Sequence, residues 1–194
     1  MKLLLATRNV HKIAEIKKEA AYCQIQILSL SDFPDIDEVI EDQKSLEANS
    51  LKKAKEIFSK SGLNSLADDS GLEVEFLNGA PGVYSARYAG KHADYLANNV
   101  KLLQELKDVP FEKRNARFRC IMTLFGNDIL FQTEGVLNGK IIFEQKGRMG
   151  FGYDPLFIPD GYSITLAEMD MDKKNTISHR GIALRKMMKI LRKL

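Results

Sequence analysis

Two adjacent carboxylates in the stretch "LADDSGLEVEFLNGAPGVYSARYAG", residues 66–90, are the strongest chemical signal in the sequence. Asp68 and Asp69 follow a short apolar run and precede Ser70 and Gly71, which predicts a turn at the end of a strand. Carboxylate oxygens at such a turn can hold a hard divalent cation and orient a water molecule on it. The same residues are also typical of an Asx-turn, in which the acids and Ser70 satisfy turn amides.

A second polar segment, "TRNVHK", connects an apolar strand to a helix. The first turn of a helix presents free backbone N–H groups and the positive end of the helix dipole. The junction therefore predicts an anion site lined by Thr7, Asn9 and Lys12. In the simpler interpretation, Asn9 caps the helix and Lys12 points to water. The segment does not follow the GxxxxGK[ST] pattern of a P-loop.

Charged residues around the next predicted helix could contribute to the same chemistry. Glu38, Glu41 and Asp42 precede this helix, and one of them could complete the coordination of a cation, although most acids there are expected to be solvated. Asn49 and Lys53 are four residues apart and therefore project from one helical face. A surface pair is the ordinary explanation for them.

Two later segments carry groups that suit a flat heterocyclic ring. In "GFGYDP", Phe151 and Tyr153 alternate with glycines and precede Asp154, which suits stacking on a base and accepting hydrogen bonds from its edge. The two aromatics could equally be core residues in a bend. In "SHRG", His179 and Arg180 begin a helix, either as part of an ordinary cap or as a polar cluster with a cation.

An α/β framework must position these residues. Strands and helices alternate along the chain with no linker, repeat or low-complexity segment to mark a boundary, which predicts a single domain over residues 1–194. The patterns predict strands at 2–7, 24–28, 65–67 and 72–76, and helices from Val10 to about Tyr22, from about Leu46 to Gly62, and from about His179 onward.

Two further patterns concern the sheet and the helical faces. Residues 116–126 alternate as a strand, and the Asn138-Gly139 pair predicts a tight hairpin, so the sheet should contain antiparallel strands and be mixed. Apolar positions at helical spacing predict the buried faces of two helices: Leu96, Val100, Leu103 and Leu106, and then Leu184, Met187, Leu191 and Leu194.

Composition limits the functional classes. With 194 residues, of which 44% are hydrophobic, the chain can bury a substantial core. A net charge of +3 is too small to demand nucleic acid as a partner. The apolar runs are short and no secretion signal is evident, so we expect a cytoplasmic protein without a membrane partner. Cys23 and Cys120 lie far apart without metal-ligand spacing, and we expect both to be reduced, buried thiols.

Five segments in order carry a resemblance that none of them carries alone: "ATRNVHK", "NSLKKA", the stretch at 66–90, "GFGYDPLF" and "SHRGIAL". Over nearly the whole chain, the sequence resembles the inosine triphosphate pyrophosphatase family, which hydrolyses non-standard purine nucleoside triphosphates. The resemblance implies an elongated mixed β-sheet flanked by helices, in two lobes with a central nucleotide-binding cleft. It also implies a homodimer that converts ITP, dITP or XTP to the monophosphate and pyrophosphate with Mg²⁺.

The resemblance assigns roles to particular residues. Asp69 matches the general base and metal-associated acid of the family, Asp68 lies beside it, and Glu41 matches the second metal ligand. His179 and Arg180 would donate hydrogen bonds to the 6-oxo group of hypoxanthine or xanthine, whereas adenine has a donor there. The residues that match substrate contacts are Thr7, Arg8, Asn9, Val10, His11, Lys12 and Lys53 on the phosphate side, Ser70 in the turn, and Phe151, Gly152, Tyr153, Asp154, Lys174, His179 and Arg180 in the base pocket.

Two other functional classes stay open from the sequence. A nucleotide-binding module without catalysis would explain the glycine loops and the cations, but an acid pair beside a phosphate site would then be counterproductive without a metal. A nucleic-acid-binding protein would explain the basic C-terminal segment, yet no extended basic stripe with interleaved aromatics accompanies it. Saturable binding without turnover would favour the first class, and salt-dependent oligonucleotide binding the second.

Overall fold

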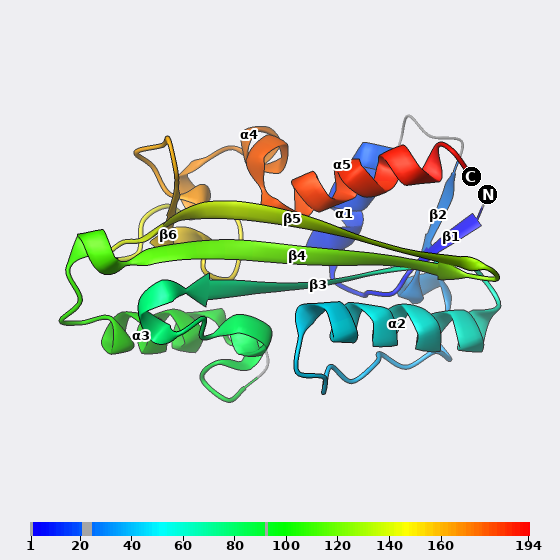
Figure 1. Cartoon of the computed structure of the whole chain (residues 1–194), viewed down its shortest axis with the longest axis horizontal. Coiled ribbons are helices and arrows are strands. Elements are labelled where there is room, and N and C mark those ends of the chain that lie inside the picture. Colours follow the sequence, from blue (N-terminus) through cyan, green and yellow to red (C-terminus); the bar gives the residue numbers. More distant parts are fainter. Residues whose placement is uncertain (1, 21–24, 92) are drawn as a thin grey trace. The chain divides into compact units, whose positions relative to one another are not determined.

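The computed structural model of the chain describes residues 2–20, 25–91 and 93–194. Within these ranges the strands form a six-stranded sheet in the order β2-β1-β3-β4-β5-β6 (Figure 1). The strands are β1 (Lys2–Leu5), β2 (Gln26–Ser29), β3 (Ser65–Val74), β4 (Asn115–Gly126), β5 (Ile129–Ile141) and β6 (Phe157–Pro159). The α-helices are α1 (Val10–Ala20), α2 (Leu46–Ser61), α3 (Tyr95–Glu105), α4 (Met171–Ile177) and α5 (His179–Leu191).

The sheet is mixed, as the sequence predicts. Strand β1 pairs in parallel with both β2 and β3, whereas β5 and β6 are antiparallel. The α/β class and the mixed sheet are therefore confirmed. None of the helices within the described ranges has both the length and the apolar character needed to span a bilayer.

The chain divides into two compact units, each built from separate segments. The first unit comprises residues 1–69, 120–135 and 180–194, and the second comprises 70–119 and 136–179. The chain passes between them four times, after Asp69, Arg119, Gly135 and His179. Strands β3, β4 and β5 each contribute residues to both units.

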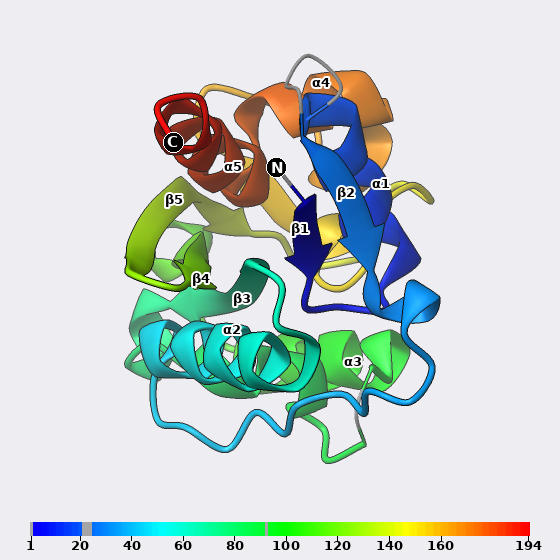
Figure 2. The ribbon, with the colours of Figure 1, turned by 90° about the vertical axis from the view of Figure 1, so that its right-hand side faces the viewer.

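In the first unit, helices cover both faces of the sheet (Figure 2). Because side chains alternate along a strand, Leu3 and Leu5 pack in one cluster with residues of α1 and α5, such as Ile16 and Leu184. Leu4 belongs to another cluster, with residues of α2 such as Ala54 and Ile57. Ser45 caps the start of α2 by accepting from the Ala48 N–H, and Gly62 ends the helix in the left-handed conformation, as predicted.

The second unit has a core of its own. Leu102 of α3 and Leu106, just after the end of this helix, pack with Leu72 of β3, Phe118 of β4 and Phe157 of β6. The predicted alternation in β4 is confirmed across both units, with Phe118, Cys120, Met122 and Leu124 all buried. Cys120 is a free thiol, whereas Cys23 and the predicted end of the first helix near Tyr22 lie outside the described residues.

The predicted turn at "DDSG" is wrong, and so is the Asx-turn alternative, because β3 runs unbroken from Ser65 to Val74 through these residues. Strand geometry persists here because the buried acids have charged partners, described below. Gly71 is needed for close approach rather than for a turn. A Cβ at this position would lie 2.4 Å from the carbonyl oxygen of Gly82.

The predicted hairpin at Asn138-Gly139 is also wrong. The connection between β4 and β5 is at residues 127–128, where Asp128 has a φ of 55°. Gly139 instead pairs with Pro159 inside the ladder between β5 and β6. Its lack of a side chain lets β6 approach, since a Cβ would lie 2.2 Å from the carbonyl oxygen of Ile158.

The predicted apolar faces are right only in part. Leu184, Met187 and Leu191 are buried as expected, but Leu194 follows the end of α5 and is exposed. In α3, Leu106 is buried and Leu103 packs against the core, but Leu96 and Val100 are 67% and 53% exposed. The buried positions of α3 include Asn98 and Asn99, because amides on this face have hydrogen-bonding partners in two loops.

Candidate functional site

Asp68 and Asp69 lie side by side in β3 and belong to opposite faces of the strand, as alternation requires. Both are buried, at 4% and 6% exposure. Asp68 pairs with α1 and α5, whereas Asp69 contacts α2. Two adjacent acids therefore have separate surroundings and separate chemistry.

Asp68 is neutralised by cations. Its Oδ2 lies 3.0 Å from Lys12 Nζ and 3.3 Å from Arg180 Nε. Burial alone would raise the pKa of Asp68, but the charges of Lys12, Arg180 and Lys53 hold it below its ordinary value. Asp68 is therefore a permanent anion that fixes cations, and not a group that exchanges protons near neutral pH.

Asp69 has the opposite character. Burial raises the pKa of Asp69 to about 6, and the charge of Glu41 acts in the same direction against Lys53. The Nδ2 of Asn49 donates to Asp69 Oδ2 at 3.0 Å, which orients the carboxyl group. A carboxylate with a pKa close to physiological pH can accept and release a proton, which is the property of a general base.

Lys53 and Glu41 form a second pair beside these acids. Lys53 Nζ lies 2.6 Å from Glu41 Oε1 and also donates to the backbone carbonyl of Asp68. Burial opposes the charge of Lys53, but Glu41, Asp69 and Asp68 raise its pKa. The surface-pair interpretation of Asn49 and Lys53 is wrong, because both are buried and both contact β3.

The segment from Thr7 to Lys12 joins β1 to α1 as expected. Asn9 Oδ1 accepts from the Lys12 N–H at 3.3 Å, so Asn9 caps the helix, while Thr7 Oγ1 accepts from the Asn9 N–H. Lys12 points to Asp68 rather than to water. Arg8 donates to the carbonyl of Ile36 at 2.9 Å. Val10, at the start of α1, is exposed, and the side chain of His11 lies outside the described residues.

The predicted base-pocket residues other than Arg180 belong to the second unit. Asp154 Oδ2 accepts from the Phe151 N–H at 2.8 Å and from Lys174 Nζ at 2.6 Å. Lys174 Nζ also lies 4.9 Å from the centroid of the Phe151 ring. Gly152, at a φ of 65°, lies between the half-buried Phe151 and the buried Tyr153. The loop thus combines an aromatic ring, a cation and a buried acid.

His179 and Arg180 have different surroundings although they are neighbours. The ring of His179 stacks on Phe118 at 4.8 Å between centroids, within the second unit. Arg180 is buried in the first unit, where its Nη1 lies 2.9 Å from Glu15 Oε2 and its Nε lies near Asp68. Asp68 and Glu15 raise the pKa of Arg180 against the effect of burial. A role for both residues in the base pocket stays a prediction.

The structure thus brings together Lys12, Asp68 and Arg180 on one face of β3, and Glu41, Lys53 and Asp69 on the other. Ser70 is half-buried in β3 at the start of the second unit, and its substrate contact stays a prediction. Three residues were missed from the sequence: Glu15, Phe118 and Asn99. Glu15 follows Lys12 by three residues on α1, and this spacing could have indicated a shared face.

The acids also bear on metal binding. Within residues 2–20, 25–91 and 93–194, no three acids, histidines or cysteines form a ready-made metal site. Mg²⁺ keeps several waters and commonly uses one or two protein carboxylates together with substrate phosphates, so Glu41 and Asp69 are a suitable donor pair. Burial is the main reason why the pKa of Asp69 is raised, with the charge of Glu41 adding to it, and a divalent cation held beside the two acids would favour the ionised form of Asp69.

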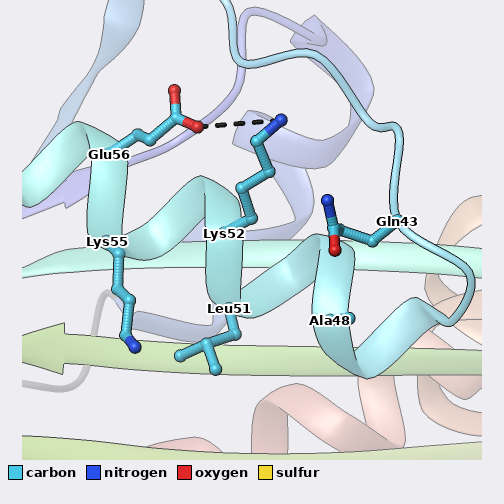
Figure 3. A pocket seen from close by; sticks show the side chains of 6 residues that line it. All are labelled: Gln43, Ala48, Leu51, Lys52, Lys55 and Glu56. Atoms are coloured by element: carbon cyan, nitrogen blue, oxygen red, sulfur yellow. Dashed lines mark ion pairs between the residues drawn. The ribbon is translucent and has the colours of Figure 1, made fainter.

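A surface hollow of about 410 Å³ lies along α2, and Figure 3 shows its lining. Lys52 and Glu56 form an ion pair at 3.8 Å beside it. It contains none of the residues predicted to bind substrate or metal. Its lining residues are Gln43, Ala48, Leu51, Lys52, Lys55 and Glu56.

Known proteins resemble this chain over its whole length. Residues 3–190 match the profile of the Ham1 family. The dITP/XTP pyrophosphatase of Desulforamulus reducens is 50% identical over 195 residues, covering 100% of this chain and 97% of that protein. That of Geobacter sulfurreducens is 48% identical, covering 94% and 92%.

Solved structures agree with these sequence matches. A HAM1 protein from Coxiella burnetii superposes with a TM-score of 0.93 at 36% identity, over 100% of both chains. The nucleoside-triphosphatase / dITP/XTP pyrophosphatase from Mycobacterium abscessus has a TM-score of 0.81 at 42% identity, over 97% of this chain and 99% of that one. Together with the arrangement of the acids in β3, these matches confirm the family resemblance found in the sequence: the chain belongs to the Ham1 family.

Proposed function

We propose that the protein hydrolyses the non-standard purine nucleoside triphosphates dITP, ITP and XTP to the nucleoside monophosphate and pyrophosphate. The relatives named dITP/XTP pyrophosphatase support this reaction. The observation that carries it is the contrast in β3 between a neutralised acid, Asp68, and a proton-accepting acid, Asp69. We propose that both units act as one catalytic domain over residues 1–194.

The charge balance of the first unit supports a requirement for Mg²⁺. Four carboxylates, those of Glu15, Glu41, Asp68 and Asp69, accompany the cations Lys12, Lys53 and Arg180. Such a set carries no surplus of positive charge with which to attract a triphosphate. A Mg²⁺ ion held by Glu41 and Asp69 would supply that charge and act as a Lewis acid on the phosphate oxygens.

The residues of this chain can perform the remaining steps. Ionised Asp69, oriented by Asn49, would take a proton from the water that attacks the α-phosphorus. Lys12 and Lys53 would neutralise the phosphate oxygens, since each is already held near the acids. The negative charge that develops on the leaving pyrophosphate would be stabilised by the same cations.

Residues of the second unit would select the base. The Phe151 ring offers a stacking surface, and the His179 ring is fixed by its stack on Phe118. A donor from His179 would match the 6-oxo group of hypoxanthine or xanthine and would meet the amino group of adenine unfavourably. We propose the same role for Arg180, which requires it to exchange a carboxylate partner for substrate.

The setting of the enzyme is also a proposal. Its substrates belong to the nucleotide pool, which supports a cytoplasmic location. We propose that it acts as a homodimer, as the family resemblance implies, and that neither nucleic acid nor membrane is a partner. Sedimentation equilibrium of the purified protein tests the dimer directly.

Isotope transfer tests the reaction and its site of attack. Hydrolysis of dITP in ¹⁸O-labelled water with Mg²⁺ should place the label in the monophosphate and release unlabelled pyrophosphate. Label in pyrophosphate would mean attack at the β-phosphorus, and release of orthophosphate would mean attack at the γ-phosphorus. Either result contradicts the proposal. Saturable dITP binding without any turnover would instead indicate a nucleotide-binding module.

A further inference from the structure

Helix α3 buries two adjacent amides on the face that meets the core. Asn98 and Asn99 are 1% and 2% exposed, whereas Leu96 and Val100 of the same helix face solvent. Burying an amide costs free energy unless its hydrogen bonds are made. The helix therefore gives up apolar burial at these positions, and the bonds of the two amides show what they hold.

Asn98 holds the segment that follows Pro81. Its Oδ1 accepts from the Ala89 N–H at 2.7 Å, and its Nδ2 lies 3.3 Å from the Ser85 carbonyl and 3.4 Å from the Ala86 carbonyl. Ser85 in turn bonds to β3, since its Oγ accepts from the Leu72 N–H at 2.9 Å. The segment is thus fixed between α3 and the part of β3 just beyond Asp69.

Asn99 holds the loop proposed to bind the base, residues 150–154, which is called the base loop below. Its Nδ2 donates to the Gly152 carbonyl at 3.0 Å and lies 3.4 Å from Gln145 Oε1. Its Oδ1 is buried without a hydrogen-bond partner among the described residues. The Nδ2 of Asn99 therefore ties the loop to α3 at Gly152.

The loop depends on such contacts for a single conformation. Gly150 and Gly152 have φ values of 77° and 65°, which only glycine adopts without strain, and glycine-rich backbone is intrinsically free. Tyr153, between Gly152 and Asp154, donates from its hydroxyl to the Ser85 carbonyl at 2.9 Å. Asn98 and Tyr153 thus share one acceptor, which joins the base loop to the segment that Asn98 holds.

We infer that Asn99 is a positioning residue for purine recognition. It holds the base loop through Gly152, within a hydrogen-bond network that Asn98 and Tyr153 complete. This inference rests on the proposed function. This network raises the fraction of molecules whose base loop is in the binding conformation, and the apparent affinity for the nucleotide scales with that fraction. The network affects recognition of the base and not of the phosphates, because the residues proposed to hold the phosphates have other interaction partners.

Replacement of the amide by side chains with the same number and branching of heavy atoms tests the inference. Asn99→Leu removes the donor, and Asn99→Asp places an acceptor opposite the Gly152 carbonyl. Each should raise KM for dITP about tenfold, the scale of one lost buried hydrogen bond, while kcat stays within about twofold. The preference for dITP over dATP in kcat/KM should fall by about the same factor. Inhibition by inorganic pyrophosphate should not change.

A core variant provides the matched control. Val109→Ala removes apolar contacts from the core of the second unit, where Val109 is buried, and touches neither loop in any hydrogen bond. It should lower thermal stability as much as Asn99→Leu without changing KM. Equal rises in KM in both variants would mean that general loosening is responsible, and the inference would be overturned.

Hydrogen exchange separates this inference from the proposed function. In the full chain without substrate, Asn99→Leu should speed exchange of the amides at 150–154 at least tenfold relative to Val109→Ala. Unchanged exchange there overturns the inference whatever the activity. If the wild-type protein hydrolyses dITP but Asn99→Leu and Asn99→Asp keep its KM and selectivity, this inference is wrong and the proposed function still holds. If the wild-type protein is inactive, the proposed function is wrong.

Discussion

Replacing Asp69 by asparagine should abolish activity and at the same time stabilise the protein. An asparagine has nearly the same shape, and its Oδ1 can accept the hydrogen bond that Asn49 now donates to Asp69. Lys53 keeps Glu41 as its partner, so the substitution leaves no cation alone. The substitution removes the buried carboxylate that acts as the base in the proposed mechanism, and should thereby lower turnover by a factor of about a hundred or more.

The expected gain in stability follows from the linkage between proton binding and folding. The pKa of Asp69 in the folded protein is raised from 3.8 to about 6. A raised pKa favours the protonated folded state, so the associated stability is complete below about pH 4 and is lost as the pH rises through 6. At about 1.4 kcal/mol for each pKa unit, the ionised acid costs on the order of 3 kcal/mol at pH 8 and well under about 1 kcal/mol at pH 4.

Thermal unfolding in EDTA at the two pH values measures this difference. For a chain of this length, Asp69→Asn should raise Tm by roughly 6–12 °C at pH 8 and by only about 1–2 °C at pH 4. EDTA removes divalent cations, which would otherwise stabilise the wild-type acid.

The neighbouring acid is the control. The pKa of Asp68 is lowered by Lys12 and Arg180 despite burial, so its stabilising effect is present above pH 4 and is lost at lower pH. Asp68→Asn should therefore lower Tm at pH 8. If both variants shift Tm in the same direction at pH 8, or if the gain from Asp69→Asn does not depend on pH, the electrostatic description of β3 is refuted.

Three further predictions follow from the site and the fold. At limiting Mg²⁺, kcat/KM for dITP should fall about tenfold per pH unit below pH 6 as Asp69 takes up its proton, and a flat profile down to pH 5 would exclude it as the base. Lys174→Met should lower the free energy of unfolding by about 3 kcal/mol, because Asp154 loses its buried partner. Adding Asp154→Leu should restore most of the lost stability in urea titrations, and no recovery would contradict the pairing. Gly139→Ala should lower the free energy of unfolding by about 2 kcal/mol or more, because the added Cβ would clash with β6. Gly62→Ala should lower it by only about 1 kcal/mol, because its Cβ meets no atom within 4 Å and the cost comes from the φ of 68° alone. The reverse order in urea titrations would be inconsistent with the packing of β6.

Local patterns in the sequence predicted the elements well where one physical cause dominates. The cap at Asn9, the helix end at Gly62 and the alternation in β4 are all decided by residues within a few positions of each other. The predictions failed where a distant contact decides the conformation. Gly71 and Gly139 look like turn residues, but each is small because another backbone, at Gly82 or Ile158, passes against it.

The candidate site shows the same division. Its acids and lysines could be named from their types, but the different roles of Asp68 and Asp69 could not. Those roles depend on Lys12, Arg180 and Asn49, which the fold brings to opposite faces of one strand. The positioning role proposed for Asn99 could not be predicted either, because an amide on a predicted helix is taken for a surface residue until its partner elsewhere in the fold is known.

The four passages of the chain between its units restrict how this enzyme can be recombined. A hybrid gene made with a single junction cannot exchange either unit whole, because neither unit is a continuous stretch of sequence. The part of base selection proposed for the second unit would therefore pass between relatives only if residues 70–119 and 136–179 were exchanged together, as a two-part insert. Two of the four junctions, after Asp69 and after His179, would fall directly beside residues of the proposed site.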